Sequence, residues 1–161
     1  MTTEEYVRHP WFEAHGVAIK WAPDQPARWI AQGNMHLLSQ YDWSQWIILC
    51  HHAQFDGLIL SHHLGIRPKH WMCTLAMARL LLGNHLGVGL DAVRKHFNIQ
   101  PKITPYNLFK GKRWAELSPA TQRLVGAGAC DEVESIWKIF NLLAKDFPKE
   151  EFRVVDATIK M

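Results

Sequence analysis

The sequence predicts an α/β or α+β domain in which a small sheet is faced by helices. Residues 16–21 and 27–30 have strand character and flank a turn at 22–26, which predicts a hairpin. Residues 46–50 form an apolar run without alternation, which is typical of a strand covered on both faces. Most of the chain that follows has helical spacing, and this order of elements gives the fold class.

Length and composition predict one folded domain over residues 1–161. Hydrophobic residues make up 48% and charged residues 20% of the chain, which excludes a disordered protein. No apolar stretch reaches the roughly 20 residues of a membrane span, and the polar start is unlike a secretory signal. The three cysteines match no zinc module, which predicts reduced thiols in a cytoplasmic protein. A net charge of +3 excludes a strongly acidic nucleic-acid mimic.

The helical spacing divides the second half of the chain into several elements. Gly65 is expected to end one helix, and Ser118 with Pro119 to begin another as its N-cap and first position. We expect helices over 35–40, 55–64, 74–82, 90–97 and 120–147, the last broken near Gly126 and Gly128. Residues 100–117 are expected to form a basic loop, and 148–161 an extended tail that leads out of the domain.

Two segments contain acidic residues that are candidates for a functional site. Asp56 follows the buried strand, at the edge of a sheet where ligand sites collect, and an acid there can hold a divalent metal or merely cap the helix. Asp131 and Glu134 are three residues apart and share one helix face, which is either functional or a solvated acidic face.

Taken together, the segments resemble the DEDD family of 3′–5′ exonucleases, as found in phage-type family A DNA polymerases. Residues 49–60, LCHHAQFDGLIL, resemble the second motif, in which Asn precedes Phe-Asp. Residues 126–137 with Asp131 resemble the third motif. Residues 71–79, 86–99 and 154–161 resemble the family's Asp-Thr-Leu segment, its L-x-x-L-D-A-V helix and its passage toward the polymerase domain. The likeness extends from about Tyr6 to the end.

The resemblance implies a ribonuclease-H-like mixed sheet flanked by helices. It implies hydrolysis of a 3′-terminal phosphodiester by two metal ions, Mg²⁺ or Mn²⁺, held by four carboxylates. Asp56 and Asp131 match two of these catalytic and metal-binding acids. A phage protein in the cytoplasm of a bacterial host is the expected setting.

The chain departs from the family at several functional positions. The first motif, Asp-x-Glu, is expected before Tyr6 and is absent, so only two of the four carboxylates remain. His52 stands in place of Asn, Cys73 in place of Asp, and Ala127 or Gly126 in place of the usual Tyr or His. Two carboxylates carry too little negative charge to hold two divalent metal ions. We therefore expect at best one weakly held metal ion and impaired catalysis.

The missing motif also belongs to the family's first, central strand. Without that strand, residues 16–21 and 46–50 are expected to have unpaired edges inside an apolar domain, which is costly. Either the two strands close against each other, or another chain, such as the partner in a homodimer, completes the sheet.

Three functions follow from these expectations. The first is an impaired exonuclease-like domain that binds single-stranded DNA. Phe55, Trp71 and Trp114 could then stack on bases, although core packing is the favoured role of the two tryptophans. The basic residues of the loop either hold phosphates or are simply solvated, and the DNA-binding candidates besides Phe55 are His52, Lys102, Lys110, Lys112 and Arg113. The second is a non-catalytic protein-interaction module, such as a phage-encoded inhibitor that reuses the fold. The third is a zinc site built from His51, His52, His62, His63, His70 and Cys73.

Overall fold

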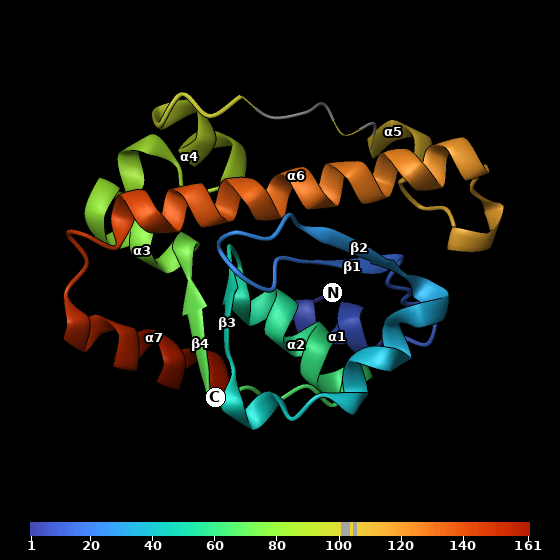
Figure 1. Cartoon of the computed structure of the whole chain (residues 1–161), viewed down its shortest axis with the longest axis horizontal. Coiled ribbons are helices and arrows are strands. Elements are labelled where there is room, and N and C mark those ends of the chain that lie inside the picture. Colours follow the sequence, from blue (N-terminus) through green and yellow to red (C-terminus); the bar gives the residue numbers. More distant parts are fainter. Residues whose placement is uncertain (101–103, 105) are drawn as a thin grey trace.

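Two separate two-stranded sheets lie at the centre of the protein. A computed structural model describes residues 1–100, 104 and 106–161 (Figure 1). β1 (Gly16–Ile19) and β2 (Arg28–Ala31) form an antiparallel hairpin in which Gly16 lies opposite Ala31. β3 (Ile47–Cys50) and β4 (His70–Cys73) are parallel, with Ile47 opposite His70. The hairpin and the parallel strand are where the sequence predicts them.

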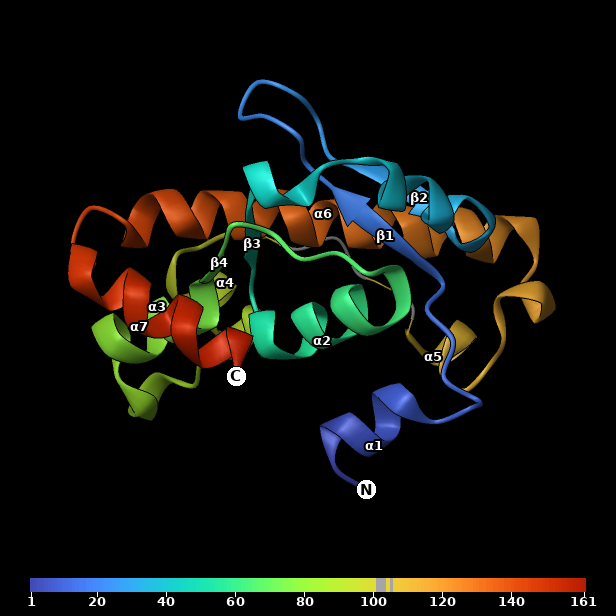
Figure 2. The ribbon, with the colours of Figure 1, turned by 90° about the horizontal axis from the view of Figure 1, so that it is seen from below.

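Helices cover both sheets. The longest, α6, packs on the hairpin and on α3 and α4, while α2 connects β3 to β4 and packs on both of these strands (Figure 2). The helices are α1 (Thr3–Arg8), α2 (Ala53–Leu64), α3 (Thr74–Leu82), α4 (Leu90–His96), α5 (Tyr106–Phe109), α6 (Pro119–Leu143) and α7 (Lys149–Lys160). Short 3₁₀ segments are η1 (Gln32–Gln40), η2 (Trp43–Gln45), η3 (Asn84–Leu86) and η4 (Trp114–Glu116).

The predicted helix boundaries have the expected local chemistry. Gly65 ends α2 in the left-handed conformation, at φ 66°, where a side chain would be strained. Ser118 caps α6 by accepting a hydrogen bond from the Thr121 backbone N–H, and Pro119 occupies the first turn. These residues end and begin helices because they satisfy backbone groups that the helix itself leaves unpaired.

Gly126 and Gly128 do not break α6, contrary to the prediction. The helix is continuous over 25 residues, and both glycines are buried within it. A Cβ on Gly126 would lie 2.8 Å from the Trp29 ring, and one on Gly128 would lie 2.5 Å from Thr104 Oγ1. The glycines serve close packing, because they let the Trp29 indole of β2 lie directly against the helix backbone.

Gly126→Ala tests this packing. Alanine favours a helix interior by about 1 kcal/mol over glycine. The clash with Trp29 reverses that gain, and we expect a net loss of about 1–2 kcal/mol in the free energy of unfolding. Urea unfolding followed by circular dichroism measures the change. Trp29→Leu is the matched background. If Gly126→Ala stabilises both backgrounds equally, Trp29 does not set the requirement for glycine.

The predicted extended tail is also wrong. Residues 149–160 form α7, which begins after Pro148 and returns to pack on β4 (Figure 1). The Asp156 carboxylate accepts hydrogen bonds from the Trp71 backbone N–H at 2.8 Å and from the His70 ring at 2.8 Å. Val155 and Ile159 contact the apolar cluster beneath. The segment therefore covers the outer edge of β4 and is part of the domain.

Three apolar clusters stabilise the arrangement. Met77, Val93 and Ile139 are fully buried between α3, α4 and α6. Trp71 and Ala53 are buried between β4 and α2, and Leu38 with Ile66 forms a third cluster near the hairpin. The fold belongs to the mixed α/β class that the sequence predicts. Among the described residues, no helix is long and apolar enough to cross a membrane.

Candidate functional site

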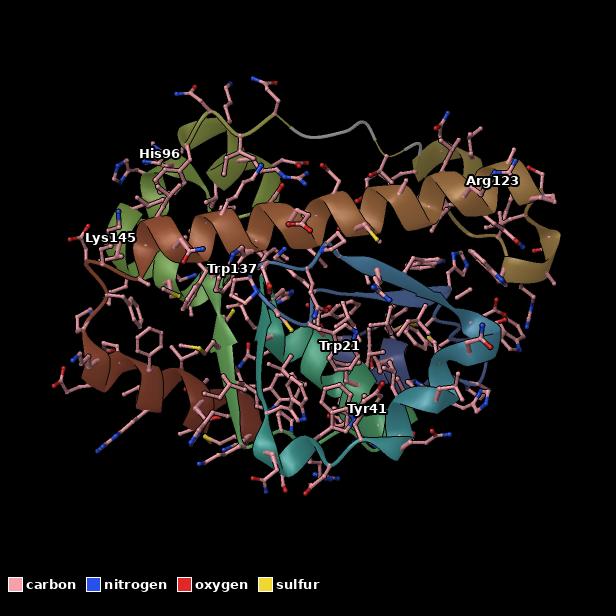
Figure 3. All side chains as sticks on the ribbon, viewed as in Figure 1. Trp21, Tyr41, His96, Arg123, Trp137 and Lys145 are labelled. Carbon is pink, nitrogen blue, oxygen red and sulfur yellow. The ribbon has the colours of Figure 1, made fainter. Side chains whose placement is uncertain are left out.

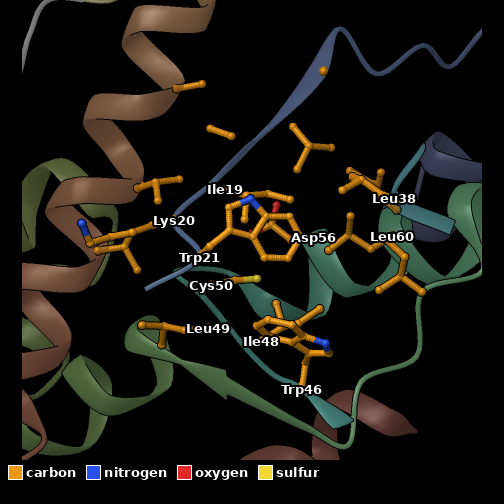
Figure 4. A pocket seen from close by; sticks show the side chains of 18 of the residues that line it. Ile19, Lys20, Trp21, Leu38, Trp46, Ile48, Leu49, Cys50, Asp56 and Leu60 are labelled. Atoms are coloured by element: carbon orange, nitrogen blue, oxygen red, sulfur yellow. The ribbon is translucent and has the colours of Figure 1, made fainter. Parts of the chain in front are cut away.

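A cavity of about 570 Å³ separates β1 from β3 (Figure 4). One wall is the hairpin strand β1 and the other is β3, and α2 and α6 contribute further lining residues. The lining is mainly apolar, but Asp56 and Glu132 place carboxyl groups on it. Trp21 stacks on Trp43 and packs edge-on against Trp46 at one end of the cavity. The two strands have therefore not closed against each other.

Asp56 is an acid on the cavity lining whose pKa is raised by its surroundings. It lies in the first turn of α2, directly after β3, as the sequence predicts. Burial and the nearby charge of Glu132 raise the pKa of Asp56 to about 6, against opposing hydrogen bonds from Cys50 and the His52 backbone. Burial also raises the pKa of the Cys50 thiol well above its usual value. Such a carboxyl is costly to keep charged, which is typical of functional sites.

The other predicted acids lie on α6 and have protein partners. Asp131 accepts a hydrogen bond from Arg94 at 3.1 Å, and the same Arg94 nitrogen donates to Ser135 at 2.9 Å. Glu134 accepts from the Ala27 backbone at 2.7 Å and pairs with Lys20, so it anchors the hairpin to α6. It is therefore neither free nor on a solvated face.

The α6 carboxyl that interacts with Asp56 is Glu132, one position after the predicted Asp131. The sequence analysis missed it, although helical spacing contains the signal. Ala129, Glu132, Val133 and Ile136 line the cavity at the i, i+3, i+4 and i+7 spacing of one helix face. Asp131 is outside this set.

Arg94 is the second residue that the sequence analysis missed. Its side chain is only 4% exposed and forms ion pairs with Asp131 and Asp91, while its Nε has no hydrogen-bond partner among the described residues. Apolar periodicity does not show whether a charged residue is buried, so the sequence gives no signal for a buried arginine at this position. Because Arg94 already neutralises Asp131, a metal ion at Asp131 would have to compete with it.

His51 is a structural residue at the end of β3. Its Nε2 donates to the Val88 carbonyl at 2.8 Å, so its Nδ1 accepts from the Thr74 hydroxyl at 2.8 Å in the neutral ring. Burial lowers the pKa of His51, which agrees with this neutral form. The ring therefore connects β3 to α3 and to the segment before α4.

The geometry does not support the zinc site that is the third of the predicted functions. His63 bonds the Val7 carbonyl, His70 bonds Asp156, and the Cys73 thiol donates to the His51 carbonyl. Across residues 1–100, 104 and 106–161, no three His, Cys, Asp or Glu side chains are grouped to hold a metal. The same test applies to magnesium: the described carboxylates do not fit a two-metal centre, which needs more anionic oxygens.

The predicted DNA-binding residues lie in two places. His52 is exposed, and its ring stacks on Phe55 at the start of α2, next to Asp56. Lys110, Lys112 and Arg113 are exposed on the segment between α5 and η4. That segment is fixed beside the start of β1, because His15 bonds the Lys112 carbonyl and Glu13 accepts from the Trp114 backbone.

The predicted stacking tryptophans do not share this exposure. Trp71 is buried at 5% exposure against Gly57, which confirms the favoured prediction of core packing and excludes the alternative that it stacks on bases. Trp114 is partly buried and packs against Trp29 and His15. Lys102 lies outside the described residues.

No family model, curated protein or solved structure matches this chain.

Proposed function

We propose that this chain is an exonuclease-like domain of ribonuclease-H type that binds single-stranded DNA and has lost most or all 3′–5′ cleavage. The observation that carries the proposal is Asp56. It is a partly buried carboxyl with its pKa raised to about 6, at the carboxyl end of a parallel strand and opposite an acid of α6. Ligand sites collect at this edge of α/β sheets.

The surroundings of Asp56 suit a nucleic-acid strand. The exposed His52 ring and the half-buried Phe55 ring are stacked beside it, and such a pair offers a platform for a base. Lys110, Lys112 and Arg113 form a basic segment that offers phosphate contacts. These two features lie on the α2 and α5 sides of the protein, and we propose that one strand contacts both.

Loss of cleavage follows from the acids that remain. Asp56 and the acids of α6 supply too few carboxylates for two metal ions, and Arg94 competes for Asp131. We propose at most one weakly held Mg²⁺ or Mn²⁺.

Fluorescence anisotropy with a labelled oligothymidylate measures the binding. We expect binding at low salt and a steep loss as salt rises, because bound phosphates release counterions. Replacing Lys110, Lys112 and Arg113 together by Gln is expected to weaken binding at least about tenfold and to flatten the salt dependence.

The matched control replaces three other exposed lysines, Lys138, Lys145 and Lys149, by Gln. Figure 3 shows Lys145 at the opposite end of the protein from Arg123, which lies near α5. Equal losses from both triple variants would mean non-specific attraction and would contradict the DNA site. The same oligonucleotide, incubated with Mn²⁺, is expected to stay intact. Rapid 3′ trimming that Asp56→Asn abolishes would contradict the loss of catalysis.

A protein-interaction module is the second candidate function. The observation that favours it is the cavity between β1 and β3. These two strands belong to separate sheets and are not paired with each other by backbone hydrogen bonds. A domain of this kind binds a partner through that gap and has no need of a metal.

A further inference from the structure

The edges of β1 and β3 that face the cavity carry unpaired backbone groups. In the hairpin, the Gln32 N–H donates to the His15 carbonyl at 2.9 Å. Antiparallel pairing alternates, so Val17 and Ile19 also bond β2, whereas Gly16 and Ala18 direct their N–H and C=O groups away from it. Both of these residues line the cavity.

The same reasoning applies to β3. The Trp46 carbonyl accepts from the Lys69 N–H at 2.9 Å, and the Trp71 N–H of β4 points outward to Asp156. Alternation along a parallel strand then directs the backbone N–H and C=O groups of Ile48 and Cys50 toward β4. The same groups of Ile47 and Leu49 face away from β4. Ile47 and Leu49 also line the cavity. Within the described part of the chain, no hydrogen bond occupies these groups on either edge.

Gly16, Ala18 and Leu49 are half-buried, whereas Ile47 is exposed. An unpaired backbone group that is shielded from water is costly, and an added strand satisfies such groups on both edges at once. We propose that the gap between β1 and β3 binds an extended apolar segment of a partner protein. The segment adds as a strand, pairs with both edges and joins the two sheets in the order β2-β1-added strand-β3-β4. This inference deepens the second candidate function, and it does not depend on DNA binding.

The chemistry of the cavity defines the segment. Each edge is four residues long, about 13 Å, so the segment needs at least four residues in extended conformation. On the sides of α2 and α6 the lining is mainly apolar, with Ile59 and Leu60 from one helix and Val133 and Ile136 from the other. The same two sides also carry the acids Asp56 and Glu132. Apolar, β-branched side chains on both faces of the segment therefore fit best. A small apolar molecule fills the space but leaves the backbone groups unpaired.

Ala18→Pro is the variant that separates strand addition from other binding. Proline removes the N–H that faces the cavity and places its ring there, whereas the N–H groups that bond β2 belong to Val17 and Ile19. Proline is tolerated at such an edge, and it keeps the preceding residue extended. Amide hydrogen exchange at Val17 and Ile30 reports whether the hairpin survives in this variant.

The experiment selects an mRNA-displayed library of random heptapeptides on the immobilised full chain. We expect enrichment of peptides rich in Val, Ile, Phe and Tyr that bind Ala18→Pro about tenfold more weakly or worse. Bound peptide is expected to slow amide exchange at Gly16, Ala18, Ile47 and Leu49, and to leave Val17 unchanged.

Three results overturn the proposal. The first is that no peptides are enriched on the wild-type chain relative to the Ala18→Pro chain. The second is peptide binding without slower exchange at the four facing amides, which indicates simple filling of an apolar cavity. The third is a dimer of the chain alone that Ala18→Pro converts to monomer in sedimentation, which identifies the occupant as a second copy. Oligothymidylate binding is measured separately, so its failure does not affect this test.

Discussion

Arg94→Ala is expected to destabilise the protein by about 3 kcal/mol or more. Arg94 is a cation with a side chain only 4% exposed, and its guanidinium lies 3.1 Å from the Asp131 carboxylate. Removing one partner of a buried ion pair leaves the other charge without compensation, and this cost is usually 3–5 kcal/mol. Truncation also removes the volume of a buried side chain. Urea unfolding at neutral pH measures the difference.

A double-mutant cycle with Asp131→Asn separates charge from packing. If the ion pair is responsible, Arg94→Ala costs much less in the Asp131→Asn background, and the coupling energy is at least about 1 kcal/mol. Arg94→Met keeps most of the volume and is expected to be destabilising as well. Equal costs of Arg94→Ala in both backgrounds would mean that Arg94 acts through packing alone.

Local chemistry explains which elements the sequence predicts well. The hairpin, β3, α2 and the start of α6 are marked by residues that act on their own neighbours, such as Pro119 at a helix start and Gly65 at a helix end. Where the outcome depends on distant contacts, the prediction is wrong. Gly126 signals a break by propensity, but the Trp29 ring from 97 residues earlier makes glycine a packing requirement.

The same distinction applies to α7 and to the site. Residues 149–160 become a helix whose Asp156 caps the edge of β4, and this contact joins positions 85 residues apart. Asp56 could be predicted because it lies in the first turn of the helix that follows the apolar strand β3, although Ile47 at the start of that strand is exposed. The acid that interacts with it, Glu132, shares one helix face with Ala129, Val133 and Ile136, so helical spacing contains a signal that the prediction did not use. The arginine that holds Asp131 could not be predicted, because apolar periodicity contains no information on whether a charged side chain is buried.

Asp56→Asn is expected to stabilise the protein by about 2–3 kcal/mol at pH 8. The pKa of Asp56 rises from 3.8 to about 6 on folding, because of burial and the Glu132 charge. Between these two pH values the folded state binds more protons than the unfolded state, so stability falls as pH rises. Above pH 6 the folded state carries the whole cost of the buried charge. A pKa shift of about two units corresponds to about 2–3 kcal/mol in the free energy of unfolding. Asparagine has a similar shape and no charge.

The pH dependence distinguishes this explanation from a general gain in packing. The advantage of Asp56→Asn is expected to grow between pH 3.8 and about pH 6. It is expected to be small near pH 3.8, where the unfolded wild-type chain is half protonated at this position, and to vanish below that pH, where both states hold the proton. Glu132→Gln removes only the neighbouring charge, so it is expected to give a smaller gain over the same window. Thermal unfolding from pH 4 to pH 8 measures all three chains. A gain from Asp56→Asn that is independent of pH would contradict a charged Asp56 in the cavity, and with it the observation on which the proposed site depends.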